Sequence, residues 1–195
     1  DPTSGEVTAD FPKINGEVRT VVPDGTGGWF VGGSFTLAGG QARTNVVRIR
    51  PDRTVDTVWT AHANGGVRAL ALWGSILYVG GQFTQVAGQP RANLAAVSSI
   101  TGEVTPWRAN TDGAVNALVR LGDFLVVGGE FSTVEGRSRK RLAALGLADA
   151  VVTAWKPDAN GAVFALAGEG VTVFVGGEFT SIGSLPRHRL AALDL

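Results

Sequence analysis

Two polar turns in the second half of the chain hold the residues best suited to bind a ligand. The stretches 110–113 (NTDG) and 158–161 (DANG) place side-chain oxygens two residues apart, as the start of a calcium-binding loop does. Neither has the distant bidentate glutamate that such a loop requires, and Asx turns explain both with fewer assumptions. We therefore predict no metal site and no cofactor, with Ca²⁺ as the alternative. The candidate ligand-binding residues here are Asn110, Asp112, Asp158 and Asn160.

The residue types of enzyme active sites occur singly. His62 and His188 have no partner His or Cys in a zinc-binding pattern, and the chain contains no Cys. No Gly-x-Ser-x-Gly motif marks a serine nucleophile. The sequence therefore predicts a protein that is not an enzyme. A hydrolase acting on glycans or other substrates stays as an alternative, which requires an acid–base pair brought together by the fold.

Arginine and tryptophan supply the cationic and aromatic groups that bind anions and sugars. Four of the arginines and three of the tryptophans recur every 48 residues, and a residue that recurs in this way is more readily explained by a structural role within each repeat. We expect these arginines to bond within each repeat and the tryptophans to pack between repeats, with an anion site and an aromatic sugar platform as alternatives. Trp29 and Trp73 break the pattern and are candidates for ligand contact. The recurring residues are Arg43, Arg91, Arg139 and Arg187, with Phe11, Trp59, Trp107 and Trp155.

The spacing of 48 residues comes from a heptapeptide that occurs four times. It reads YVGGQFT at 78–84 and recurs in closely similar form at 30–36, 126–132 and 174–180. A fixed period of this kind is typical of repeat architectures. The paired glycines lack the spacing of a phosphate-binding loop and lie inside a predicted strand. We expect them to let neighbouring repeats approach closely or to mark a bulge. They are Gly32, Gly33, Gly80, Gly81, Gly128, Gly129, Gly176 and Gly177.

Each repeat predicts four short strands joined by turns. The first is an apolar run of the type that is buried on both faces, such as 67–72. The heptapeptide supplies the second strand, a run such as 94–97 the third, and a segment ending in the recurring aromatic residue the fourth. Such four-stranded antiparallel units at this period are typical of propeller blades. We predict an all-β fold, a β-propeller of four 48-residue, four-stranded antiparallel blades.

The two ends of the chain predict how the ring closes. The chain opens with a fourth strand at 4–11 and ends on a third strand at 190–195, so the N-terminal strand would complete the last blade. The alternatives are half of an eight-bladed ring made by two chains and a segment of a longer propeller. We predict one β-propeller domain, 1–195. Its blade units are approximately 12–59, 60–107, 108–155, and 156–195 plus 1–11.

Composition restricts the class of protein. Lys and Arg together number 17, as do Asp and Glu, so the formal net charge is zero and no nucleic-acid partner is expected. No apolar run is long enough for a transmembrane helix, so no membrane insertion is expected. The chain contains no Met, which predicts that residue 1 is not the native start of translation.

The repeat resembles that of the delta-60 repeat β-propellers, a family of bacterial secreted and surface proteins. The family pattern runs Tyr-Val-Gly-Gly-x-Phe-Thr, Gly, Arg, Leu-Ala-Ala-Leu-Asp, Thr-Gly, and Trp-x-x-x-x-x-Gly. Tyr78 to Gly113 follows it nearly throughout, and the resemblance covers essentially the whole chain. The propeller region of the fungal cell-polarity surface marker family is similar. The resemblance implies a fold and an extracellular setting, and no agreed biochemical activity.

These observations together predict a non-catalytic interaction or scaffold module of a secreted or surface protein, located outside a bacterial cell. Its partner would be a protein or a glycan at the cell surface, and the chain would act alone, as a homodimer or as part of a larger chain. One alternative function is a lectin-like propeller that binds sugar. The other is a hydrolytic enzyme, glycan-active or not, with its site at the channel mouth.

Overall fold

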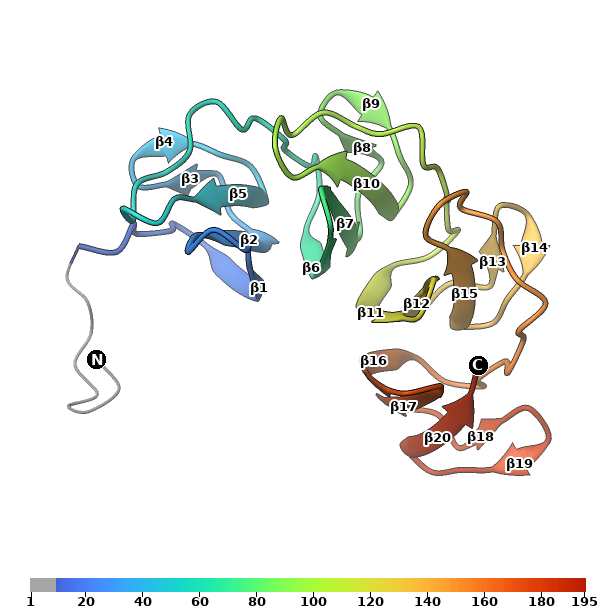
Figure 1. Cartoon of the computed structure of the whole chain (residues 1–195). Helices are drawn as coiled ribbons and strands as arrows, with labels where there is room; N and C mark the ends of the chain where they lie inside the picture. Colours follow the sequence, from blue (N-terminus) through green and yellow to red (C-terminus); the bar gives the residue numbers. More distant parts are fainter. Residues whose placement is uncertain (1–9) are drawn as a thin grey trace.

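The computed structural model describes residues 10–195 of the chain. These residues form four similar units, numbered 1 to 4 in chain order, that follow one another along a curved row (Figure 1). Each unit combines a three-stranded antiparallel sheet with a two-stranded hairpin, and residues 10–195 contain no helix. The predicted all-β repeat architecture is confirmed.

The strands have equivalent positions in the four units, and the strand with the paired glycines is the middle strand of each sheet. The sheets contain β1 (Glu17–Pro23), β2 (Trp29–Ser34) and β5 (Val46–Ile49); β6 (Val67–Trp73), β7 (Ile76–Gly81) and β10 (Leu94–Ser98); β11 (Val115–Leu121), β12 (Phe124–Gly129) and β15 (Leu142–Gly146); β16 (Val163–Glu169), β17 (Thr172–Gly177) and β20 (Leu190–Asp194). The hairpins are β3 (Leu37–Ala38) with β4 (Gln41–Ala42), β8 (Gln85–Val86) with β9 (Gln89–Pro90), β13 (Thr133–Val134) with β14 (Arg137–Ser138), and β18 (Ser181–Ile182) with β19 (Leu185–Pro186).

The fourth strand predicted for each unit is reduced to a single bridge in the described residues. In unit 2 that bridge joins Val97 and Val104, and equivalent bridges occur in units 1 and 3. The backbone N–H of Thr105 still bonds Ala96, but Pro106 has no N–H with which to continue the ladder. The chain then leaves the sheet so that Trp107 enters the next unit. The predicted four-stranded blades are therefore not confirmed.

The two glycines of each pair have different surroundings. A Cβ on Gly80 would lie 2.6 Å from Cγ1 of Val115, which belongs to the next unit. A Cβ on Gly81 would instead collide with the backbone carbonyl of Gly66 within its own unit, beside a register shift between Val67 and Ala69. The first glycine thus permits close packing between units, and the second accommodates a bulge in the inner strand.

In residues 10–195, three hydrophobic cores lie between consecutive units, at contacts that we call junctions, and a fourth lies within unit 1. The core of the junction between units 1 and 2 joins Phe30 and Val46 to Trp59 and Val67. The other two junctions have equivalent cores. The inner strands β1, β6, β11 and β16 also contact one another in sequence along the inside of the row (Figure 1). Each unit is therefore held mainly by its neighbours, as expected for a repeat protein.

The row is open: units 1 and 4 lie at its two ends, and its shape is roughly that of a half-ring (Figure 1). The predicted closed four-bladed ring is not found. The strand expected to complete the last blade falls mostly in residues 1–9, outside the described residues. Its last two residues lie against unit 1, where Asp10 pairs with Arg53 and Phe11 packs on Trp29. The repeated junction sets the curvature, and three junctions do not return the row to its start.

Candidate functional site

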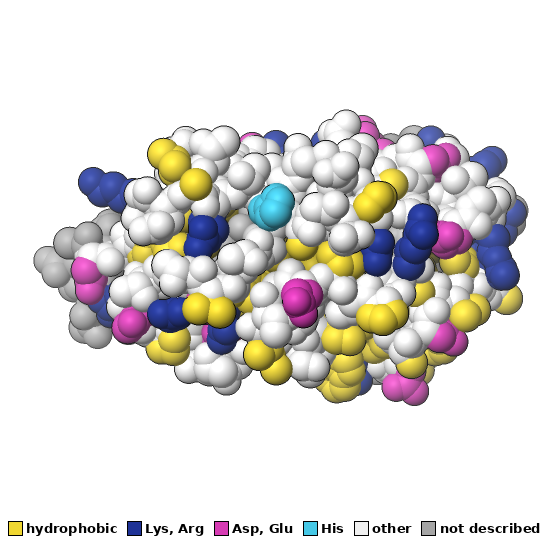
Figure 2. Space-filling model, turned by 90° about the horizontal axis from the view of Figure 1, so that it is seen from above, with side chains coloured by type: hydrophobic (Ala, Val, Ile, Leu, Met, Phe, Trp, Pro, Cys, Tyr) yellow, Lys and Arg dark blue, Asp and Glu magenta, His cyan; other side chains and the backbone are white. Residues whose placement is uncertain are grey.

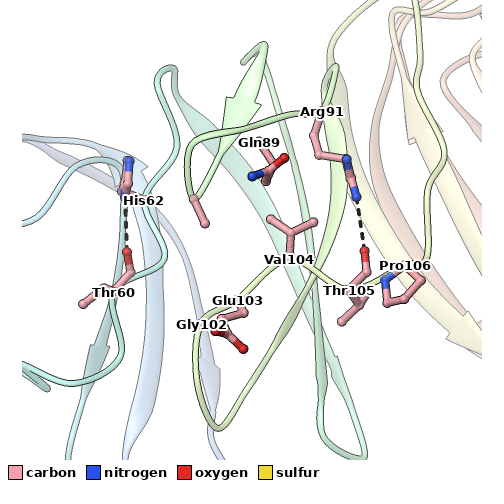
Figure 3. A pocket seen from close by; sticks show the side chains of 10 residues that line it. Thr60, His62, Gln89, Arg91, Gly102, Glu103, Val104, Thr105 and Pro106 are labelled. Carbon is pink, nitrogen blue, oxygen red and sulfur yellow. Dashed lines mark hydrogen bonds between the residues drawn. The ribbon is translucent and has the colours of Figure 1, made fainter.

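A groove on the outer rim of unit 2 has a volume of about 620 Å³. It lies between the β8–β9 hairpin and the segment 102–106. His62 and Thr60 stand on one side and Arg91 on the other, with Gln89 and Val104 between them (Figure 3). We call this cavity the unit 2 rim groove. Its exposed His62, Gln89 and Glu103 side chains can all bind a polar ligand.

Unit 1 carries a groove at the same repeat position, with a volume of about 470 Å³. Pro12, Gln41 and Val55 occupy the places that Thr60, Gln89 and Val104 occupy in unit 2. The charged groups differ, because the unit 1 rim groove is lined by two arginines, Arg50 and Arg53. The same groove therefore occurs in units 1 and 2, where different charged side chains line it.

The surface around these grooves is chemically mixed. Viewed onto the outer rim, basic and acidic side chains alternate with hydrophobic ones, and no single type forms a continuous patch (Figure 2). This pattern agrees with the zero net charge of the chain. It suits a short-range, shape-dependent contact better than binding through a long-range electrostatic field.

A cleft of about 500 Å³ lies between units 2 and 3 and contains Trp73, one of the predicted ligand contacts. The Trp73 side chain is 47% exposed, and the Arg120 guanidinium lies 3.2 Å from the centroid of its rings. Asp123 and Asp149 line the same cleft. An exposed indole beside two carboxylates is a combination that sugar-binding sites use, with stacking on one group and hydrogen bonds to the other.

Trp29, the other irregular tryptophan, is half-buried in unit 1. Its rings pack edge-on against Phe11, with centroids 5.7 Å apart. Trp29 also contacts the core cluster of its own unit. The structure therefore separates the two candidates, because only Trp73 lines a cavity.

The candidate Asx residues bond to the backbone. Oδ1 of Asp112 accepts the N–H groups of Ser132 and Thr133, and Oδ1 of Asn160 accepts those of Thr180 and Ser181. Burial opposes ionisation of Asp112, but these N–H bonds outweigh it and lower the pKa of the carboxyl. Both side chains thereby attach the start of an outer hairpin to the turn before the inner strand.

Asn110 and Asp158 form a second equivalent pair at the junctions. Oδ1 of Asn110 accepts the Ala92 N–H, and Oδ1 of Asp158 accepts the Lys140 N–H. Asp158 also lies 3.5 Å from the Lys156 ammonium. Asp158 and Asn160 line a cavity of about 470 Å³ between units 3 and 4. The four candidates are thus distributed over two junctions and do not converge on one site.

The recurring arginines bond carbonyl groups within their own units. Nη1 of Arg91 donates to Pro90 and Nη2 donates to Thr105, so the side chain ties the β8–β9 hairpin to the segment after β10. Arg43 and Arg139 make the equivalent pair of bonds, and Arg187 makes the first of them. Carbonyl bonding fits the structural interpretation of these residues better than an anion site.

The recurring tryptophans cross the junctions. The indole N–H of Trp59 donates to the Ser98 carbonyl of unit 2, and its rings pack on Phe30 of unit 1 at 5.2 Å between centroids. Trp107 repeats both contacts with Gly146 and Tyr78. Trp155 donates to the Asp194 carbonyl. These contacts leave the indoles poorly placed to serve as a sugar platform.

Sequence reasoning missed a polar cluster on the inner strands. Arg68 donates to Asn116 and Glu130 of the next unit and to Gln82 of its own. Asn116 in turn donates to the Val163 carbonyl of unit 4. The signal was available, because Arg68 and Asn116 are each a polar residue at the second position of a strand whose next three residues are apolar. The cluster links three units through direct side-chain bonds.

A buried ion network occurs only in unit 1, among the described residues. Burial alone would raise the pKa of Asp24, but N–H bonds from Thr26 and Gly28 and the Arg48 guanidinium lower it to about 2. Arg48 also lies 3.6 Å from Asp56. The turn at 24–28 is therefore held by Asp24 as a structural loop.

Within residues 10–195, no group of three or more His, Asp or Glu side chains is arranged to hold a metal ion. None of these residues belongs to a helix that is long and apolar enough to cross a membrane.

Residues 23–57 match a family model described as "Domain of unknown function (DUF5122) beta-propeller". The match extends from the end of β1 to the bridge after β5, and it supports a propeller repeat family. No curated protein matches the sequence.

Two similar solved structures are computationally designed proteins. Ika4 has 14% identity over 68% of this chain and 92% of its own, with a TM-score of 0.34. Ika8 has 15% identity over 87% of this chain and 71% of its own, with a TM-score of 0.37.

Proposed function

We propose that this chain is a non-catalytic interaction module that binds a partner through its rim grooves. The observation that carries the proposal is the pair of grooves at equivalent positions in units 1 and 2, which differ in their charged side chains. A rigid repeat scaffold that varies the side chains at one position is a common basis for protein recognition. The partner is an extended polypeptide segment that spans neighbouring grooves.

The state of the acidic residues supports a non-catalytic role. A catalytic acid at neutral pH needs a raised carboxyl pKa. The carboxyl groups of Asp24, Asp56 and Asp112 have lowered pKa values instead, because hydrogen bonds to the charged form outweigh burial. These groups act as fixed acceptors for backbone and arginine donors.

A bacterial extracellular or cell-surface location is part of the same proposal. It rests on the resemblance of the repeat to secreted and surface proteins. A rim with interspersed charges suits contact with a protein or glycan in that setting.

A random peptide library displayed on phage tests the groove. Selected peptides should bind the chain, and Gln89→Ala combined with Glu103→Ala should weaken their affinity by at least about tenfold, since 1.4 kcal/mol corresponds to that factor. Ile100→Ala, on an exposed turn of the same unit, is the control and should leave the affinity unchanged. Equal affinity for the groove variant and the control would refute the groove as the binding surface.

The Trp73 cleft favours a second candidate function, binding of a sugar between units 2 and 3. The exposed indole, Asp123 and Asp149 supply an aromatic surface and acceptors for sugar hydroxyls. A glycan array should then show binding that Trp73→Ala abolishes and that Trp29→Ala, outside any cleft, preserves. An array without signal would eliminate this function.

A further inference from the structure

The two ends of the half-ring expose hydrophobic side chains that the internal junctions bury. At the end formed by unit 4, which we call the last face, Leu190 is 68% exposed and Phe174 is 41% exposed. At the end formed by unit 1, the first face, Val18 and Val21 are exposed to similar extents. Exposed apolar side chains grouped on one face of a protein commonly mark a site of association.

These faces are the two halves of one junction. Leu190 takes the repeat position of Leu94 and Leu142, which are completely buried against the following unit. Val18 takes the position of Val67, which is completely buried against the preceding unit. The last face therefore has the surface that receives a following unit, and the first face has the surface that a preceding unit covers.

Gly176 provides the most specific evidence. The equivalent Gly80 and Gly128 lie so close to valines of the next unit that an added Cβ would be 2.6 and 2.5 Å from a valine Cγ1. An added Cβ on Gly176 would meet only its own unit, at 3.5 Å from Cβ of Ala165. The space that a valine of the next unit fills at Gly80 and Gly128 is thus present at the last face, and no side chain of residues 10–195 fills it.

The aromatic residues at the ends match in the same way. Trp59 packs on Phe30, and Trp107 packs on Tyr78, across their junctions. Phe11 of the first face has the repeat position of Trp59 and Trp107. Phe174 of the last face has the repeat position of their partners, Phe30 and Tyr78. Both rings are about two-fifths exposed, at 39% and 41%.

We infer that a second copy of this chain docks head to tail on the first and completes a closed ring of eight units. The last face of each copy covers the first face of the other, with Val18 on Gly176 and Phe11 on Phe174. One chain forms a half-ring (Figure 1). Two half-rings related by a two-fold axis make this junction twice, so the assembly closes and leaves neither face exposed. The new junction would repeat the side-chain contacts of the three internal junctions.

A disulfide tests this contact directly, because the chain has no cysteine of its own. At the junctions that follow units 2 and 3, an added glycine Cβ lies 3.2 and 3.3 Å from the valine Cβ, slightly shorter than the separation of about 3.5–4.5 Å in a disulfide, so a small shift brings the two sulfurs into bonding range. The double variant Val18→Cys with Gly176→Cys should therefore form a covalent dimer under mild oxidation. Each single variant should remain uncrosslinked.

The pattern of products separates the competing assemblies. A disulfide formed inside one chain, a ladder of longer oligomers, or an uncrosslinked double variant would each overturn the two-chain ring. The assignment is made on non-reducing gels with mass spectrometry of the linked peptides. This experiment is independent of the rim grooves, so it can fail while peptide binding persists.

Solution mass provides the second test. Sedimentation equilibrium should give twice the 20.2 kDa of one chain. Leu190→Arg should give the mass of one chain, because the charge would be buried in the new junction. The matched control is Ile100→Arg, which has the same 68% exposure but lies on a turn away from both faces, and it should keep the dimer mass. Circular dichroism checks that both variants fold, and a single-chain mass for the unmodified protein contradicts the inference.

Discussion

The internal junctions and the two end faces use the same repeat positions in opposite surroundings. Leu142 in the junction between units 3 and 4 is completely buried, whereas Leu190, one repeat later, is 68% exposed. The residues and the local strand structure are the same. The difference shows that a unit does not bury the apolar residues that face the following unit, and that their burial depends on whether another unit follows.

Truncation of the two leucines gives the largest expected effect. Leu142→Ala should lower the free energy of unfolding by about 2–5 kcal/mol, because it removes buried methyl groups and leaves a cavity. Leu190→Ala should change the stability of the single chain by less than about 0.5 kcal/mol. Urea denaturation at a concentration where the protein sediments as one chain measures both. Equal losses would contradict the comparison.

Substitution of glycine by alanine should have different effects at an internal junction and at the last face. Gly80→Ala should destabilise the chain by about 1–3 kcal/mol, because the new Cβ overlaps the Val115 side chain. Gly176→Ala has ordinary contacts only and should leave single-chain stability unchanged while it weakens the dimer. Thermal unfolding and sedimentation measure the two effects. A stable Gly80→Ala variant would show that the junction can move apart.

The first junction contains an ion network where the next two have alanines. Arg48 faces Phe30 in register, as Ala96 faces Tyr78 and Ala144 faces Val126. The pKa of Asp24 falls from 3.8 to about 2 on folding, so its stabilisation is present above pH 3.8 and is lost as the pH falls through about 2. That shift corresponds to ~2 kcal/mol.

Asp24→Asn should therefore remove ~2 kcal/mol of stability at pH 6 and much less near pH 2. Urea denaturation at several pH values measures this difference. Asp149→Asn, an exposed substitution at the edge of the Trp73 cleft, is the control. A pH profile for Asp24→Asn that runs parallel to that of the unmodified chain would falsify the role of the network.

Loss of the indole N–H gives the smallest effect. Trp107→Phe leaves the Gly146 carbonyl without its 3.0 Å bond in a buried junction, which should cost about 1–2 kcal/mol. Trp155→Phe removes the equivalent bond to Asp194 at a more exposed place and should cost less. Chemical denaturation of both variants compares them. A larger loss at Trp155 would contradict the ranking of the two indoles by burial.

The sequence predicted the repeat, the all-β class and the order of strands within each unit, because these depend on local patterns. It did not predict the loss of the fourth strand. Pro106 and Trp107 show why: the indole gains a buried position in the next unit, and that gain is visible only when the units are packed. The 24–28 turn was equally ambiguous, since only the structure shows Arg48 beside Asp24.

The candidate site was harder to predict than the fold. Trp73 was identified correctly as an irregular residue, and the structure places it in a cleft. Whether it binds a ligand stays a prediction. The rim grooves were not predicted, because each groove combines a linker, a hairpin and a turn that are distant in sequence. Arg68 and Asn116 join residues of three units, which no local pattern reveals.

By itself the sequence determined that this chain is built from four copies of one β unit, since a period of 48 residues with fixed glycine, arginine and aromatic positions follows from local chemistry. Only the tertiary structure decided that the described units form an open half-ring. The reason is physical: the curvature arises from how a valine of one unit fits the space at a glycine of another. That fit depends on side-chain packing in three dimensions and not on the length of the repeat.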